Sequence, residues 1–312
     1  MADAENKRKF MQLLRLGVQD KIRALQLIKI LFTEDEVNTD IGLKAQLADG
    51  DRQTLLPSCG TKLAEVAAWQ TLAWRDAFSM APYFLEVINN KPLRIKQVLQ
   101  GELNGFGTGL TVWPAACVLI KYLEYQSAHT VKELVNSDNP FLLELGSGTG
   151  AVGISAAMLL QAGRVVLTDL DNVRFIMEAN VALAQQDEAV NKHVTLQVDT
   201  YEWGLLPSEN LILPSENVYP DLILVSDCIL PRLYPIEPLV EALTKLSRSH
   251  TRIIISYECR HFQHFDPKQR FWELMEAKNF LLREIDTNEY HPQFIAADIE
   301  VWEIINSSER NL

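Results

Sequence analysis

Hydrophobic and polar positions follow two different patterns along the chain. Through about residue 85, apolar residues recur at helical spacing between charged ones, with a polar stretch containing glycine and proline over residues 35–60. From Pro92 onward, short apolar runs alternate with amphipathic segments, which is typical of an α/β chain. The pattern therefore predicts a helical N-terminal extension over residues 1–85 and an α/β domain over residues 86–312.

The second region predicts strands and helices in a regular order. The predicted strands cover residues 141–145, 164–169, 193–198, 221–227 and 252–257, and the predicted helices cover residues 150–160, 172–185, 236–248 and 267–278. Only a loop separates two final strands, near 280–286 and 295–304, so the parallel sheet is predicted to end in an antiparallel hairpin. Dinucleotide dehydrogenases continue instead with a second βαβ half. A strand or hairpin arm is also predicted around Leu93 and Ile95.

Composition and charge narrow the class of protein. The net charge of −12 argues against a non-specific nucleic-acid binder and suits a basic partner or a lysine-bearing substrate. The four cysteines are scattered, without the paired spacing of zinc or redox sites. The charged N-terminus has no apolar signal core, and no stretch approaches the ~20 apolar residues of a membrane span. We therefore expect a soluble protein of the cytoplasm, and also of the nucleus, with neither membrane nor nucleic acid among its partners.

The most informative segment is the predicted strand 141–145 with the glycine turn that follows it. Three alternating glycines occupy the turn (Gly146-Ser-Gly-Thr-Gly150), and a helical pattern continues beyond them. This geometry lets a nucleotide-like ligand approach bare backbone at the carboxyl edge of a sheet. The spacing from Gly146 to Ala151 also matches the loose dinucleotide fingerprint. Glu144 favours another ligand, because a carboxylate repels the pyrophosphate of NAD and attracts the ammonium of S-adenosylmethionine. The segment therefore predicts a methyltransferase.

Asp169, at the end of the second predicted strand, supports this prediction. It lies near the ~20-residue distance from the glycine turn at which a carboxylate binds ribose hydroxyls. The alternative is an N-cap for the helix that begins near Asn172, for which Asp171 would serve equally well.

Four segments together resemble the seven-β-strand methyltransferases: residues 144–150, Thr168-Asp-Leu170, Trp203-Gly204 and Val225-Ser-Asp-Cys228. More narrowly, the chain resembles the family-16 protein-lysine methyltransferases over about residues 92–305, including Tyr257-Glu-Cys-Arg260. The resemblance implies a Rossmann-like seven-stranded sheet and S-adenosyl-L-methionine as cofactor. It also implies a protein substrate that bears the acceptor lysine, with AAA ATPases or chaperones as its class.

The resemblance also implies which residues contact the cofactor. These are Trp113, Glu144, Gly146, Ser147, Gly148, Asp169, Trp203 and Ser226. Gly146 and Gly148 would let the methionine part approach the backbone. Trp203 would stack on the adenine, or be an indole at the edge of the core. Trp113 would cover the cofactor, or anchor the helix that follows it.

The acceptor site departs from the family pattern. The family carries an Asp-x-x-Tyr motif here, whereas this chain has Asp227 followed by Leu230, which offers no hydroxyl. Contacts to the acceptor amine would then come from Asp227, Tyr234 or Tyr257, or the acceptor differs. The alternative for Asp227 is a cap of the next helix.

Glu258 is a second candidate carboxylate, with an ion pair to Arg260 or another cation as the alternative. The predicted catalytic residues are thus Asp227, Tyr234 and Glu258. His261 and His264 have no third ligand at a recognisable spacing, so we interpret them as surface residues and predict no metal.

Methyl transfer to lysine requires positioning above all, since sulfonium already activates the methyl carbon and the amine must arrive neutral. Two alternatives remain open at this point. The chain could be a methyltransferase for another acceptor, or an inactive cofactor-binding interaction module, which Leu230 would favour.

Overall fold

A computed structural model describes residues 82–98, 108–135, 137–213, 216, 218–230, 235–260 and 265–307, without the side chains of residues 128–134. The predicted helical extension therefore lies outside the described residues, apart from its last few positions. Those positions belong to a strand, β1 (Tyr83–Ile88), so the predicted boundary between residues 85 and 86 falls inside this strand.

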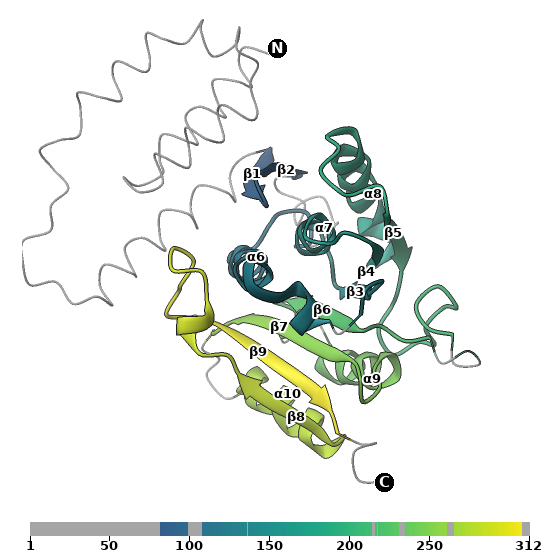
Figure 1. Cartoon of the computed structure of the whole chain (residues 1–312). Helices are drawn as coiled ribbons and strands as arrows, with labels where there is room; N and C mark the ends of the chain where they lie inside the picture. The colour runs from purple at the N-terminus through teal and green to yellow at the C-terminus, as the bar shows by residue number, and fades with distance from the viewer. Residues whose placement is uncertain are drawn as a thin grey trace, which may run out of the picture.

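The centre of the fold is a seven-stranded sheet in the order β5-β4-β3-β6-β7-β9-β8 (Figure 1). Five strands are parallel: β3 (Phe141–Leu145), β4 (Gly163–Asp169), β5 (Val194–Thr200), β6 (Leu222–Ser226) and β7 (Arg252–Glu258). The antiparallel hairpin is formed by β8 (Phe280–Glu284) and β9 (Ile299–Asn306). The last strand enters the sheet between β7 and β8, and a short 3-10 helix (Thr287–Glu289) lies in the hairpin's loop. The predicted Rossmann-like fold is confirmed.

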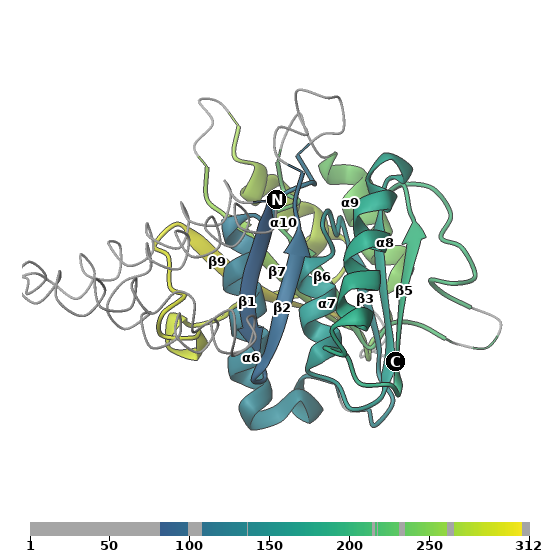
Figure 2. The ribbon, with the colours of Figure 1, turned by 90° about the horizontal axis from the view of Figure 1, so that it is seen from above.

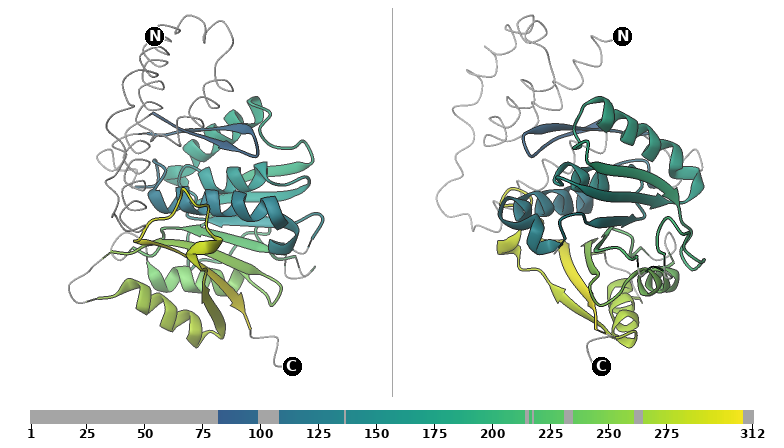
Figure 3. Two further views of the ribbon diagram at one scale, coloured as in Figure 1. Left: turned by 60° about the vertical axis from the view of Figure 1, so that its left-hand side comes forward. Right: turned by 45° about the vertical axis from the view of Figure 1, so that its right-hand side comes forward.

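Helices cover both faces of this sheet (Figure 3). On one face lie α6 (Pro114–Leu134), α7 (Ala151–Met158) and α8 (Asp171–Gln186), and on the other lie α9 (Ile236–Leu246) and α10 (Pro267–Ala277). The buried strand β3 shows how its side chains divide between the layers. Leu142 packs with the α6–α7 layer, whereas Leu143 and Leu145 pack with the α9–α10 layer, because successive side chains of a strand point to opposite faces. Glu144 therefore faces the same layer as Leu142.

The predicted hairpin arm is the pair of strands β1 and β2 (Lys91–Lys96), and β2 packs beside α8 (Figure 2). Asn89 and Asn90 form its turn with φ angles of 50° and 62°, as a two-residue hairpin turn of the primed type requires. Asn180 of α8 accepts a hydrogen bond from the Lys96 amide and donates to the carbonyl oxygens of Lys96 and Thr149. The buried Asn180 thus connects the hairpin to the glycine turn.

Among the described helices, none combines the length and the hydrophobicity that crossing a membrane requires.

Candidate active site

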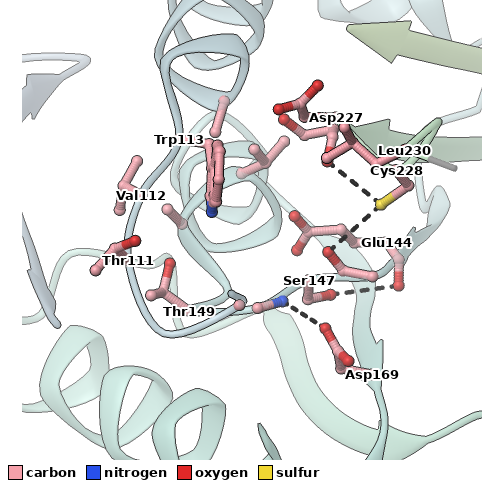
Figure 4. Close-up of a pocket in the computed structure, with 17 residues that line it drawn as sticks. Thr111, Val112, Trp113, Glu144, Ser147, Thr149, Asp169, Asp227, Cys228 and Leu230 are labelled. Atoms are coloured by element: carbon pink, nitrogen blue, oxygen red, sulfur yellow. Dashed lines mark hydrogen bonds between the residues drawn. The ribbon is translucent and has the colours of Figure 1, made fainter. Parts of the chain in front are cut away.

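A pocket of about 540 Å³, counted to its open mouth, lies at the carboxyl ends of β3, β4 and β6 and beside the starts of α6 and α7 (Figure 4). Ligands bind at this edge of open parallel sheets. The pocket is lined by all predicted cofactor residues except Trp203, and by one predicted catalytic residue, Asp227. Chain segments more than 100 residues apart thus meet in one pocket, as the resemblance implies.

Glu144 is a buried carboxylate in this pocket. It is 2% exposed, and its Oε2 accepts a hydrogen bond from the amide of Gly153 in the first turn of α7, 3.0 Å away. Burial and the charge of Asp169 raise the pKa of Glu144 to about 8, against the opposing hydrogen bonds from Ser147 and Gly153. No ion pair joins Glu144 to a cation within the described part of the chain. A cationic ligand at this carboxylate would stabilise its ionised form.

Asp169 holds the glycine turn to the end of β4. Its Oδ2 accepts a hydrogen bond from the Gly148 amide and its Oδ1 accepts one from Leu170, both 2.7 Å long. Burial raises the pKa of Asp169, and both amide hydrogen bonds oppose that rise. The N-cap of α8 is Leu170, and no side chain caps this helix, so the capping interpretation of Asp169 is wrong.

Gly146 and Gly148, which are predicted to let the cofactor approach the backbone, are also required by the protein's own packing. Gly146 and Gly148 have φ angles of 65° and 54°, which favour glycine. A Cβ on Gly146 would lie 2.6 Å from Cys228 Sγ, and one on Gly148 would lie 2.5 Å from the carbonyl oxygen of Gly109. The turn therefore needs glycine for its conformation and for close packing before any ligand is considered.

Two serines in the pocket join neighbouring strands. Ser147 Oγ accepts a hydrogen bond from the Thr168 amide at 3.0 Å and donates to the Glu144 carbonyl oxygen at 3.4 Å, which joins β3 to β4. Ser226 Oγ lies 3.1 Å from Ser256 Oγ and joins β6 to β7. Both side chains therefore shape the pocket floor.

The two predicted tryptophans differ in position. Trp113 forms a wall of the pocket opposite Glu144 and Asp227 (Figure 4), and its Nε1–H donates to the Thr108 carbonyl oxygen at 2.9 Å. Because α6 begins at the next residue, Trp113 both lines the pocket and precedes the helix. Trp203 packs against the hydrophobic cluster of the α9–α10 layer, next to Gly146. Its place at the edge of the core agrees with the alternative interpretation, and its contact with adenine stays a prediction.

Asp227 follows β6 in an unusual backbone conformation, with φ of 55°. It is 4% exposed, and both carboxylate oxygens accept hydrogen bonds from Arg260, at 2.7 Å from Nη1 and 2.6 Å from Nη2. The Glu258 amide donates a third hydrogen bond to Asp227 Oδ1, 3.3 Å away. The N-cap of α9 is Pro235, without a side-chain cap, so the capping interpretation of Asp227 is wrong.

The remaining acceptor candidates are placed as follows. Glu258 pairs with Arg260 at 3.1 Å and does not line the pocket, which confirms the ion-pair alternative. Tyr257 is 2% exposed and packs against Trp272 in the α9–α10 layer, so the expectation that it contacts the acceptor is wrong. Burial raises the pKa of Tyr257 to about 12. Leu230 lines the pocket. Tyr234, His261 and His264 lie outside the described residues.

Comparisons with known proteins agree with this geometry. Residues 88–278 match the family model described as lysine methyltransferase. The chain belongs to the lysine methyltransferase family. Over 173 residues it is 33% identical to protein N-lysine methyltransferase METTL21A of Danio rerio, covering 55% of this chain and 69% of that protein. It is also 29% identical over 191 residues to protein-lysine N-methyltransferase EFM6 of Saccharomyces cerevisiae, covering 56% of this chain and 74% of that protein.

The cofactor of this methyltransferase is S-adenosyl-L-methionine, and the pocket residues fit it. The buried Glu144 suits the ligand's ammonium, and Asp169 suits hydroxyl groups at the end of β4. Within the described residues, no group of three or more His, Cys, Asp or Glu side chains is arranged to hold a metal ion.

Sequence reasoning on this methyltransferase missed two residues of the site. Gly153 leaves no room for a Cβ, which would lie 2.7 Å from Glu144 Oε2, and a glycine inside a helical pattern was the available signal. Arg260 was considered only as a partner of Glu258. Its position just beyond β7, at the same sheet edge as Asp227, could have suggested the second and closer contact.

Proposed function

We propose that this methyltransferase methylates the ε-amino group of a lysine that enters the pocket between Trp113 and Asp227. The position of Asp227 carries the proposal. It is a buried carboxylate at the carboxyl end of β6, and it lines the same pocket as Glu144 and Asp169. We call Glu144, the 146–150 turn and Asp169 the cofactor end. We call Trp113, Asp227, Leu230 and Arg260 the acceptor end.

Each residue has a physical role in this proposal. The cofactor supplies a methyl group on a sulfonium, which needs no further activation. Glu144 binds the ammonium and Asp169 binds the ribose, and both are held by backbone amides of the fold. Trp113 and Leu230 give the pocket apolar walls that exclude water. Asp227 orients the incoming nitrogen, and orientation is the largest contribution that a protein makes to such a displacement.

The substrate class is part of the same proposal. Ser226-Asp-Cys-Ile229 and Tyr257-Glu-Cys-Arg260 resemble segments of the family member that methylates valosin-containing protein, an AAA ATPase. This similarity supports an AAA ATPase or a chaperone of the cytoplasm or nucleus as the substrate. The net charge of −12 supports a basic surface around the acceptor lysine.

A second candidate function is an inactive module that binds the cofactor and a partner protein. The buried Leu230 favours it, because the family's tyrosine hydroxyl is missing from the pocket wall.

Mass spectrometry of methylated lysate proteins separates these functions. The purified full chain is incubated with dialysed cell lysate and a cofactor that carries a deuterated methyl group. We expect deuterated methyl-lysine, and much less of it with Asp227→Asn. The matched control is Asp187→Asn, because Asp187 forms a comparable pair with Arg94, about 24 Å along α8 from the pocket. Label only on other residues would indicate another acceptor. No label despite cofactor binding would indicate the inactive module.

A further inference from the structure

Arg260 connects the two walls of the acceptor end. Its guanidinium binds both oxygens of Asp227, which is a paired geometry with high specificity. The same group lies 5.7 Å from the centre of the Trp113 ring, and its side chain is 22% exposed. A permanent cation therefore lies beside the residues between which the acceptor amine is proposed to enter.

The charge of Arg260 changes what Asp227 does to an incoming lysine. An isolated carboxylate would bind lysine as an ammonium and raise its pKa, which opposes catalysis because only the neutral amine is a nucleophile. When Asp227 is paired with Arg260, the positive charge of the guanidinium cancels most of the rise in the pKa of the incoming lysine that Asp227 would otherwise cause. Among the described residues, the titratable groups that face Arg260 are Asp227 after β6, with Glu258 and Tyr257 at the end of β7. One cation is thus shared by two carboxylates, and its removal would take this positive charge away from both.

We propose that Arg260 is a positioning residue that fixes the Asp227 carboxylate and keeps the acceptor lysine in its neutral form. The inference rests on the proposed function, which it deepens. The lysine proton leaves to bulk water before transfer. The nitrogen lone pair then forms the new N–C bond while the C–S bond breaks, and the electron pair of that bond stays on sulfur. The methylated ammonium releases its second proton to water.

The dependence of the initial rate on pH tests this role. Rates of label transfer from the cofactor to lysines of dialysed, heat-treated lysate proteins are measured between pH 6.5 and 10. Arg260→Gln is expected to move the midpoint of the profile up by about one pH unit. Its rate should be about tenfold below wild type at pH 7.5 and recover at pH 9.5. Asp227→Asn keeps the cation and should move the midpoint in the opposite direction.

Two further variants separate charge from geometry. Arg260→Lys keeps the charge but cannot bind both oxygens as a planar fork, so we expect a lower rate at every pH and a midpoint near that of wild type. Arg94→Gln is the matched control, because Arg94 binds Asp187 through two nitrogens far from the pocket. It should leave the midpoint unchanged.

The outcomes distinguish this inference from the function on which it rests. No transfer by the wild type would overturn the proposed function, and the inference with it. An active wild type with an unshifted midpoint in Arg260→Gln would overturn the inference alone. If melting curves show that Arg260→Gln does not fold, the pH profile of Asp227→Asn tests the inference instead. An unshifted midpoint in that profile would also overturn the inference.

Discussion

The cofactor end and the acceptor end of the pocket are built in different ways. At the cofactor end, Glu144 and Asp169 are held by backbone amides of adjoining segments, Gly153, Gly148 and Leu170. At the acceptor end, Asp227 is held mainly by a side chain from the end of another strand, Arg260. The first arrangement follows from two consecutive strand–turn–helix units. The second forms only when β6 and β7 are aligned side by side.

This difference predicts how each end responds to mutation. Changes at the cofactor end should alter ligand affinity and local folding together, because the same amides bind the carboxylates and shape the turn. Changes at the acceptor end should alter turnover and its pH dependence, with little effect on cofactor affinity.

The largest expected effect is at the acceptor end. Asp227→Asn should reduce turnover about a hundredfold, the loss that a displacement of ~1 Å can cause. The affinity for S-adenosylhomocysteine, measured by calorimetry, should stay within about twofold of wild type because the amide keeps the shape of the carboxylate. Asp187→Asn is the control. A loss of affinity as large as the loss of turnover would show that the two ends are not separable.

Asp169→Ala should weaken cofactor binding by roughly tenfold to a hundredfold, since it removes a charge-assisted acceptor worth about 1.5–3 kcal/mol. The structure adds a second consequence. The amide of Gly148 loses its partner, so the melting temperature of the unliganded protein should fall as well. Both quantities are measured on one variant, and unchanged affinity with a lower melting temperature would contradict the ribose role.

Glu144 should make cofactor binding depend on pH. Its pKa is raised to about 8 in the unliganded protein, and a cationic ligand needs the ionised carboxylate. Affinity should therefore rise about 25-fold from pH 6 to 7.5, with release of a proton on binding. Glu144→Gln should bind more weakly, with a flat profile. Calorimetry at three pH values checks this. If the affinity rose equally with pH in both proteins, Glu144 would be ruled out as the titrating group.

The same raised pKa has a consequence for stability. The unfolded chain ionises at the ordinary pKa of glutamate, 4.5, whereas the folded protein retains the proton up to about pH 8. The unfolded state thus binds fewer protons between these values, so this group lowers the free energy of unfolding as pH rises from about 4.5 to about 8. Denaturant titrations at several pH values should therefore show that the free energy of unfolding falls more steeply with pH in the wild type than in Glu144→Gln over this window.

The smallest effect is expected at Leu230. This side chain is buried in the pocket wall, so Leu230→Tyr inserts a larger ring and should cost about 1–3 kcal/mol of stability. If Tyr234 supplies the hydroxyl, turnover should be unchanged or a few-fold lower, and Tyr234→Phe should slow turnover. A large gain in turnover with Leu230→Tyr would show that the missing hydroxyl limits the wild type.

The bounds of a strand could be predicted closely from the sequence where all of its residues are buried. The predicted strand 141–145 coincides with β3, because five buried residues between a proline and a glycine allow no other bounds. The insertion of β9 between β7 and β8 was not predicted, because a loop between two strands does not indicate which one joins the sheet.

The cofactor end was determined largely by the sequence, since Glu144, the glycine turn and Asp169 occur within two adjacent units whose geometry follows from strand and turn preferences. Tertiary structure decided the rest. It placed Tyr257 in the α9–α10 layer, because the alternation of side chains and the register between β6 and β7 set the face on which it lies. It also folded the turn after β5 so that Trp203 packs against the same layer. It also brought Arg260 to Asp227, because parallel strands end at a common edge and a buried carboxylate requires a partner there.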